Sequence, residues 1–244
     1  MVSYSEFVSS SISGVSNRTA ICFSHLRWNF VFQRPQHLIQ RLSSEMPVIF
    51  WEEPIFSDRN ECSLEAIPVS DTLTVARLLL HEGTDEQTCT DLQRKFLNEM
   101  IAGRGIENML LWYYSPLMFR FSDHLKSDCV VYDCMDELSA FKGAHPLMKQ
   151  EEARLLARAD LVFTGGHSLY EAKRHQHRDI HPFPSSVDVA HFRTARTTRP
   201  EPEDRLTWPP RADHDTGIPL ANDEQSLPRR RDRWPRSQQR KSKC

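Results

Sequence analysis

Short, continuous apolar runs alternate with helical patterns along most of this chain, and this alternation restricts the fold more than any other feature. A strand whose apolar residues are continuous rather than alternating is buried on both faces, as in a parallel sheet covered by helices. The sequence therefore predicts an α/β fold built on a mainly parallel sheet. The runs are TAICFS at 19–24, PVIFW at 47–51, NMLLWYY at 108–114, CVVY at 129–132 and LVFT at 161–164.

Helical patterns fill the segments between these runs. Pro35 suits the first turn of a helix over 36–44, because proline lacks an N–H that the first turn leaves unpaired anyway. Strands joined by such helices predict a doubly wound, Rossmann-like sheet. Further elements expected are helices over 85–102, 146–157 and 168–175, one or two strands over 64–80, and a last strand over 180–183.

The composition changes near residue 197. Residues 197–244 hold seven of the fifteen prolines and four arginines between 229 and 233, and their apolar residues are too scattered to form a core. We therefore expect a flexible N-terminus over 1–17, one folded domain over 18–196, and a disordered tail rich in proline and arginine over 197–244.

Charge and cysteine content narrow the class of partner and the location. The net charge of −2 and the pI of about 6.6 do not predict a nucleic-acid partner. The first residues lack a basic region followed by an apolar one, and no run approaches the about 20 apolar residues of a membrane span. The six cysteines form no CxxC pair, which is typical of reduced thiols. We expect a cytoplasmic protein; a peripheral position at the inner face of the membrane stays open.

The loop after the first run holds several residues suited to binding and catalysis. In open parallel sheets, ligands bind outside the carboxyl ends of the strands. His25 could act as acid or base, Arg27 and Arg34 could bind anionic oxygen, and Trp28 could stack on a sugar. The alternative is that Trp28 packs and both arginines are solvated. Gln36 follows in the same segment and is included as a substrate-binding candidate.

A second group of polar residues follows the fourth run. Asp133, Asp136 and Glu137 could bind Mg²⁺, hold sugar hydroxyls or supply a base. The alternative is that Asp136 caps a helix that begins at Glu137. The residues expected to be catalytic are Asp133, Asp136, Glu137 and His25, and no metal site is expected.

A glycine pair follows the fifth run. Gly165 and Gly166, with Ser168, could bind an anion at the start of a helix, although a tight turn needs glycines as well. Tyr114, at the end of the third run, is a further substrate-binding candidate. The chain has no GxGxxG and no P-loop, so no dinucleotide or Walker-type cofactor is expected.

Six segments together resemble the N-terminal half of bacterial GT-B glycosyltransferases of the group 1 or family 4-like type. Among these, the chain is most similar to enzymes of teichuronic acid and related cell-surface polysaccharide synthesis. The resemblance implies two Rossmann-like domains, of which the first contacts mainly the acceptor and the second mainly the nucleotide-sugar donor. The segments are FSHLRWNFVFQRPQHL, WEEP, LWYYSP, VVYDCMDELSAF, ADLVFTGGHSLYEAK and HPFPSSVDVAHF.

The resemblance also implies roles for individual residues. His25, Arg27, Arg34 and Gln36 would face the cleft between the domains, with the Asp133 to Glu137 loop and the Gly165–Gly166 turn on the same rim. Val187, Asp188 and Phe192 resemble the junction between the domains. Residues 197–244 have no counterpart of the donor domain, which is the pattern of a reading-frame change or a truncated gene.

Three functions follow as expectations. The first is the acceptor-binding half of a glycosyltransferase that moves a sugar from a nucleotide sugar to a cell-surface polysaccharide or lipid-linked acceptor, inactive or weak alone because the donor contacts come from the other half. The second is a non-catalytic binding module that needs a partner carrying the donor domain. The third is a metal-dependent hydrolase that uses the three carboxylates of the fourth loop.

Overall fold

The structure is a computed structural model that describes residues 18–58, 62–184, 186–187 and 189–193. The chain divides into two compact units, residues 1–186 and 187–244. Within the second unit the structure describes one short helix, α6 (Val189–Arg193). The flexible N-terminus expected over 1–17 and the disordered tail expected over 197–244 lie outside the described residues, and so does Asp188 of the expected junction.

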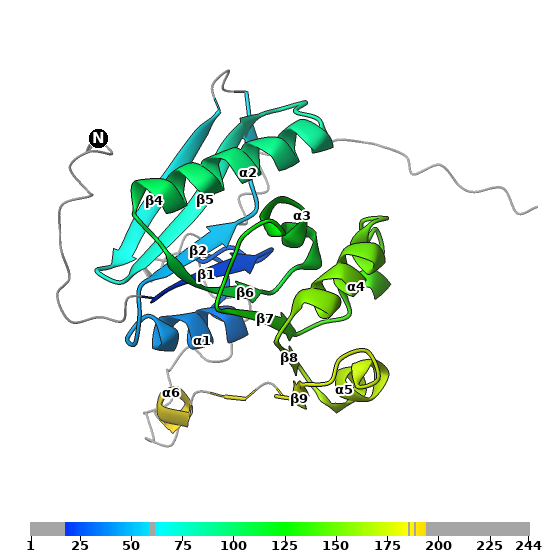
Figure 1. The fold of residues 1–244 in the computed structure, drawn as a ribbon. Helices are drawn as coiled ribbons and strands as arrows, with labels where there is room; N and C mark the ends of the chain where they lie inside the picture. The colour runs from blue at the N-terminus through cyan, green and yellow to red at the C-terminus, as the bar shows by residue number, and fades with distance from the viewer. Residues whose placement is uncertain (1–17, 59–61, 185, 188, 194–244) are drawn as a thin grey trace, which may run out of the picture. The chain divides into compact units, whose positions relative to one another are not determined.

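The described part of the first unit contains one sheet of nine strands (Figure 1). Seven of these strands lie in parallel along the order β5-β2-β1-β6-β7-β8-β9, which confirms the predicted α/β, mainly parallel Rossmann-like sheet. The strands are β1 (Arg18–Ser24), β2 (Val48–Glu52), β3 (Ile55–Ser57), β4 (Ser63–Ser70), β5 (Leu73–His81), β6 (Asn108–Tyr113), β7 (Cys129–Cys134), β8 (Leu161–Thr164) and β9 (Ile180–Pro182).

Strand β1 lies at the point where the winding of the sheet reverses. The chain passes from β1 to β2 on one side, with Ser24 beside Glu52, and later returns to β6 on the other side, with Phe23 beside Tyr113. At such a switch point the loops that follow neighbouring strands diverge and leave an opening at the carboxyl edge. The loop after β1 and the neighbouring strand ends are therefore the expected position of a ligand site.

At the edge of the sheet formed by β5, two further strands are added: β4 forms an antiparallel hairpin with β5, and the short strand β3 follows β2 after a break. Strand β4 pairs with β5 in antiparallel fashion, so the segment 64–80 expected to hold one or two strands forms two. Strands β2 and β3 both run parallel to β5, with Trp51 opposite Ala76 and Ile55 opposite Leu79. The irregular stretch between β2 and β3 contains one residue more than the stretch of β5 opposite it. At this break the backbone carbonyls of Glu53 and Pro54 accept hydrogen bonds from Arg27.

Helices cover both faces of the sheet. The larger buried cluster contains Leu97 and Met100 of one helix and Leu155 and Leu156 of another, whereas Ile39 of α1 packs on the opposite face. Figure 1 shows α1 and α2 on opposite sides of the sheet. Burial of each such aliphatic side chain contributes about 1.5–3 kcal/mol. The helices are α1 (Arg34–Leu42), α2 (Glu86–Gly103), α3 (Phe119–Ser122), α4 (Met148–Arg158) and α5 (His167–Lys173).

The helical predictions hold for the longer helices and fail for the short turns. Pro35 lies in the first turn of α1, and Gly105, with φ of 60°, follows the end of α2, as the sequence predicts. The turn Pro116–Met118 and α3 are not predicted, because they are too short to show a period. The capping interpretation of Asp136 is wrong: the 3₁₀ turn Leu138–Ala140 has Glu137 at its N-cap position, and no side chain caps it.

None of the helices that the structure describes is both long enough and apolar enough to cross a membrane.

Candidate functional site

Arg34 and Asp133 form a buried ion pair beneath the carboxyl edge of the sheet. Arg34 lies in the first turn of α1, and Asp133 lies near the end of β7. Arg34 Nη2 is 2.8 Å from Asp133 Oδ1, and Nε donates to both carboxylate oxygens, at 3.1 and 3.0 Å. The Arg34 side chain is 12% exposed and that of Asp133 is 0% exposed. Arg34 also donates to the backbone carbonyl of Phe183, so one side chain ties α1 to β7 and to the segment after β9.

The pair determines what Asp133 can do. Burial raises the pKa of Asp133, and the hydrogen bonds and charge of Arg34 act in the opposite direction. Because both carboxylate oxygens accept from Arg34, the side chain holds Arg34 rather than facing solvent. Tyr114 is buried close by, and its hydroxyl interacts with the carboxylate of Asp133. Burial, and then the charge of Asp133, raise the pKa of this phenol.

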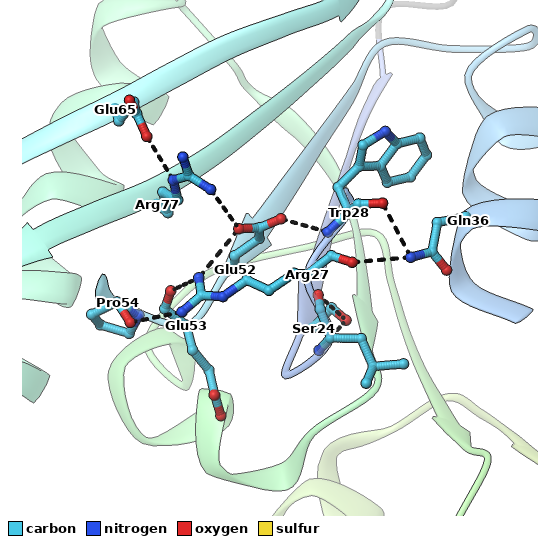
Figure 2. A network of polar contacts seen from close by, with 10 residues as sticks. Ser24, Arg27, Trp28, Gln36, Glu52, Glu53, Pro54, Glu65 and Arg77 are labelled. Carbon is cyan, nitrogen blue, oxygen red and sulfur yellow. Dashed lines mark hydrogen bonds and ion pairs between the residues drawn. The ribbon is translucent and has the colours of Figure 1, made fainter. Parts of the chain in front are cut away.

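Glu52 is the centre of a second network, which fixes the start of the loop after β1 (Figure 2). Its carboxylate is 1% exposed and accepts from the backbone N–H of Trp28 at 2.6 Å and from Arg27 Nη1 at 3.2 Å. Arg77 Nη1, from β5, lies 3.5 Å from the same carboxylate. Arg27 also donates to the backbone carbonyls of Glu53 and Pro54. The guanidinium of Arg27 is therefore engaged within the protein.

Gln36 and Trp28 hold the same loop from the α1 side. Gln36 is fully buried, and its Nε2 donates to the carbonyls of Arg27 at 3.1 Å and Trp28 at 3.3 Å. Its Oε1 accepts from the backbone N–H of Gln33 at 3.0 Å. The Trp28 ring packs edge-on against Phe50, with 5.0 Å between ring centroids. The structure thus places Arg27, Trp28 and Gln36 in the scaffold of this loop.

Glu137 belongs to a third polar group, around a buried lysine. Lys173 Nζ of α5 lies 2.8 Å from Glu137 Oε2 and 2.8 Å from Glu152 Oε1. The hydroxyl of Tyr132 donates to the same oxygen of Glu152 at 2.7 Å. Burial opposes the charge on Lys173, but the hydrogen bonds to the two glutamates outweigh it and raise the pKa of the lysine. The loop after β7 is thereby anchored to α4 and α5.

The glycine turn after β8 packs directly against the loop after β7. Gly165 N–H donates to the carbonyl of Cys134 at 2.9 Å. A Cβ atom on Gly165 would lie 2.3 Å from the carbonyl oxygen of Met135, which is closer than real Cβ atoms approach, whereas a Cβ on Gly166 would meet nothing within 4 Å. Gly165 thus serves the packing of two loops. Gly166 and Ser168 lie at the N-terminus of α5, where Ser168 is exposed.

His25 and Asp136 retain polar atoms that no other part of the described protein engages. The Nδ1 atom of His25 is buried without a hydrogen-bond partner among the described residues. Burial lowers the pKa of His25, and the negative charge of Asp136 acts in the opposite direction. Within the described residues the carboxylate of Asp136 makes no hydrogen bond or ion pair; only its backbone carbonyl accepts, from the Cys134 thiol.

The three carboxylates of the loop after β7 therefore do not converge on one point. Asp133 is engaged by Arg34 and Glu137 by Lys173, whereas Asp136 acts on His25 through its charge. No group of three or more His, Cys, Asp and Glu side chains in the described residues could hold a metal ion. An open hollow of about 500 Å³ lies elsewhere, between the end of α1 and Trp112.

Sequence reasoning did not single out Glu52, Lys173 or Glu152. Glu52 had one available signal: it ends an apolar run in the segment WEEP, and a carboxylate at the end of a buried strand needs a partner. Lys173 and Glu152 had none, because a lysine or glutamate in an amphipathic helix normally faces water.

Comparison with known proteins identifies the fold. No family model and no curated protein matches the sequence. Sucrose-phosphate synthase from Thermosynechococcus elongatus matches with a TM-score of 0.51 at 13% identity, over 75% of this chain and 53% of that chain. The trehalose-6-phosphate protein from E. coli bound with UDP-2-fluoro glucose matches with a TM-score of 0.46 at 8% identity, over 74% and 52%. The chain spans about half the length of these proteins. The first likeness shows the fold alone: the described sheet and helices share the α/β architecture of part of that synthase.

Proposed function

We propose that this chain is the acceptor-binding part of a glycosyltransferase that moves a sugar from a nucleotide sugar to a cell-surface polysaccharide or lipid-linked acceptor. The observation that carries the proposal is the buried Nδ1 atom of His25, which has no hydrogen-bond partner among the described residues and lies in the loop that follows β1 at the carboxyl edge of the sheet. The other charged residues predicted for the site are engaged inside the protein. His25 and Asp136 are the ionisable groups that a ligand at this edge can use.

The chemistry follows from the state of these two groups. Because burial lowers its pKa, His25 is neutral near pH 7 and its imidazole can accept a proton. In the proposed reaction, an acceptor hydroxyl gives its proton to His25 while its oxygen forms a bond to the anomeric carbon of the donor sugar. The bond from that carbon to the diphosphate breaks, and the nucleoside diphosphate leaves. Asp136 binds an acceptor hydroxyl and stabilises the imidazolium that forms.

Arg34, Asp133, Gln36 and Glu52 have a supporting role in this proposal. They hold the loop after β1, which carries His25. Gly165 and Lys173 hold the loop that carries Asp136. A site supported on rigid strand ends keeps its reacting groups in position without a cost in ordering at each turnover.

A second reading is a binding module that needs a separate donor-domain partner, and copurification of the chain with such a partner tests it. The hydrolase alternative lacks support, because Asp133 is paired with Arg34 and Glu137 with Lys173. Calorimetric titration with Mg²⁺ and Mn²⁺ tests that alternative directly, and tight binding that Asp136→Asn abolishes would revive it.

The test of acceptor binding is an NMR titration of the ¹⁵N-labelled full chain with glucose, glucuronic acid, N-acetylglucosamine and UDP-glucose. We expect at least one free sugar to shift the backbone amides of loops 25–33 and 135–140 in a saturable way. His25→Ala and Asp136→Ala should each weaken this binding, whereas the control His81→Ala, at an exposed position, should not. If no sugar shifts these amides, or if the shifts survive both substitutions, the proposal is wrong.

A further inference from the structure

Three consecutive large apolar residues are exposed at the tip of the loop between β1 and α1. Phe30 is 74% exposed, Val31 50% and Phe32 53%. In the described part of the first unit, the other exposed large apolar side chains, such as Phe56 and Val69, are separated from one another in sequence. Single exposed apolar residues are normal on protein surfaces, but a contiguous apolar group marks an interaction site. We call residues 30–32 the apolar tip.

The apolar tip presents no free charge. Residues 28–33 are uncharged, and the two arginines that flank them turn inward. Arg27 engages Glu52 and two backbone carbonyls, and Arg34 engages Asp133. Insertion of the tip into an apolar medium therefore requires no ion to lose its hydration, which is the largest cost of such a transfer.

A further exposed phenylalanine belongs to the segment that Arg34 holds. Arg34 donates to the backbone carbonyl of Phe183, whose side chain is 53% exposed. The Phe183 ring packs edge-on against Phe163, with 5.0 Å between centroids, so its position is fixed by the sheet. Arg34 thus links the base of the apolar tip to another exposed aromatic side chain at the same edge of the sheet.

We propose that the apolar tip inserts into the interfacial region of a lipid bilayer. Phenylalanine and tryptophan rings favour that region, and a bilayer requires no complementary shape. A stable protein interface needs about 800 Å² on each partner, which three side chains on a loop do not supply. The proposal goes beyond the proposed function and does not depend on it. Taken together with that function, it specifies a lipid-linked acceptor.

The experiment is cosedimentation of the full chain with phosphatidylcholine vesicles, which carry no net charge. We expect binding of the strength of a single acyl chain, about 10⁴ M⁻¹. Phe30→Ser/Val31→Ser should weaken it at least about tenfold, because each buried large apolar side chain contributes about one order of magnitude. The further variant with Phe32→Ser should bind more weakly still. The matched control is Phe56→Ser/Val69→Ser, which removes similarly exposed side chains from β3 and β4.

Because the tip is uncharged, binding should not change between about 0.05 and 0.5 M NaCl. The inference is overturned if the unaltered chain does not bind these vesicles, if the tip variants bind as the control does, or if salt abolishes binding. It is also overturned if sedimentation velocity shows that the tip joins two copies of the chain and no vesicle binding occurs. Thermal unfolding verifies that each variant is folded. Sugar-induced NMR shifts that persist in Phe30→Ser/Val31→Ser would separate failure of this inference from failure of the proposed function.

Discussion

The guanidinium of Arg34 holds the carboxylate of Asp133 at 2.8 Å, although the two residues are 99 positions apart in the sequence. Both residues were candidates for contact with substrate. Their pairing assigns them to the support of the site. Of the four residues expected to be catalytic, His25 and Asp136 are the two whose side chains make no hydrogen bond or ion pair within the described residues.

Replacement of Arg34 by Met should lower the free energy of unfolding by about 3–5 kcal/mol, because it leaves a buried carboxylate without a counter-ion. Arg34→Met/Asp133→Asn should recover part of that loss. Urea unfolding measures both. The control Arg41→Met removes an exposed arginine of the same helix and should change stability by less than about 0.5 kcal/mol.

The cost of Arg34→Met should also grow with pH. Burial raises the pKa of Asp133, and loss of Arg34 removes the group that opposes this rise. A folded-state pKa above the unfolded value means that the folded state binds more protons in the window between them, so stability falls as pH rises through that window. Urea unfolding at about pH 5 and about pH 8 should give the larger loss at the higher pH. An equal loss at both would contradict this account of the pair.

Replacement of Glu52 by Ala should cost about 2–3 kcal/mol, since it removes a buried acceptor from Arg27, Arg77 and the Trp28 N–H while both arginines keep some access to water. Glu65→Ala removes the more exposed carboxylate at the far end of the same network and should cost less than about 1 kcal/mol. Chemical denaturation compares the two variants. Similar losses would mean that Glu52 is not the centre of the network.

Replacement of Gly165 by Ala should cost about 1–3 kcal/mol, because the added Cβ would overlap the Met135 backbone and force the two loops apart. Gly166→Ala is the matched control. Its backbone is extended, with φ of −179°, and its Cβ meets open space, so its stability should be unchanged or higher by up to about 1 kcal/mol. Thermal unfolding of the two variants measures this difference. Equal melting temperatures would contradict the close approach of Gly165 to the Met135 backbone.

Replacement of Asp136 by Asn should lower the pKa of His25 further, because the carboxylate opposes the effect of burial. An NMR pH titration of the His25 ring protons measures this, with Asp71→Asn, in an exposed turn, as the control. A depressed histidine pKa makes stability fall as pH drops through the unfolded value of about 6.5, and Asp136→Asn should steepen that fall. An unchanged titration curve would remove the basis for pairing these residues in catalysis.

The sheet could be predicted from the sequence because each buried strand carries its own signal. The continuous apolar residues of β1, β6 and β7 have to be covered on both faces, and that requirement is local. Pro35 and Gly105 likewise mark the start and end of helices through their own backbone preferences. The 3₁₀ turns around Leu117 and Ser139 were missed, because three residues carry no period.

The site could be located by its loops but not resolved into roles. Asp133 and Asp136 lie three positions apart and read alike in the sequence. Asp133 is the buried partner of an arginine, whereas Asp136 makes no ion pair within the described residues and acts on the pKa of His25 through its charge. Lys173 offered no signal at all, since its burial depends on Glu137 and Glu152 from two other elements.

The sequence by itself determined the α/β class, the strands and the loops at their carboxyl ends, because hydrophobic periodicity and backbone preference act between neighbours in the chain. Only the tertiary structure decided which of the polar residues in those loops are engaged within the protein and which retain unengaged atoms. The reason is physical: whether a carboxylate or guanidinium is neutralised depends on burial and on a partner brought by another element, and the packing of the sheet places Arg34 on Asp133 and Arg27 on Glu52.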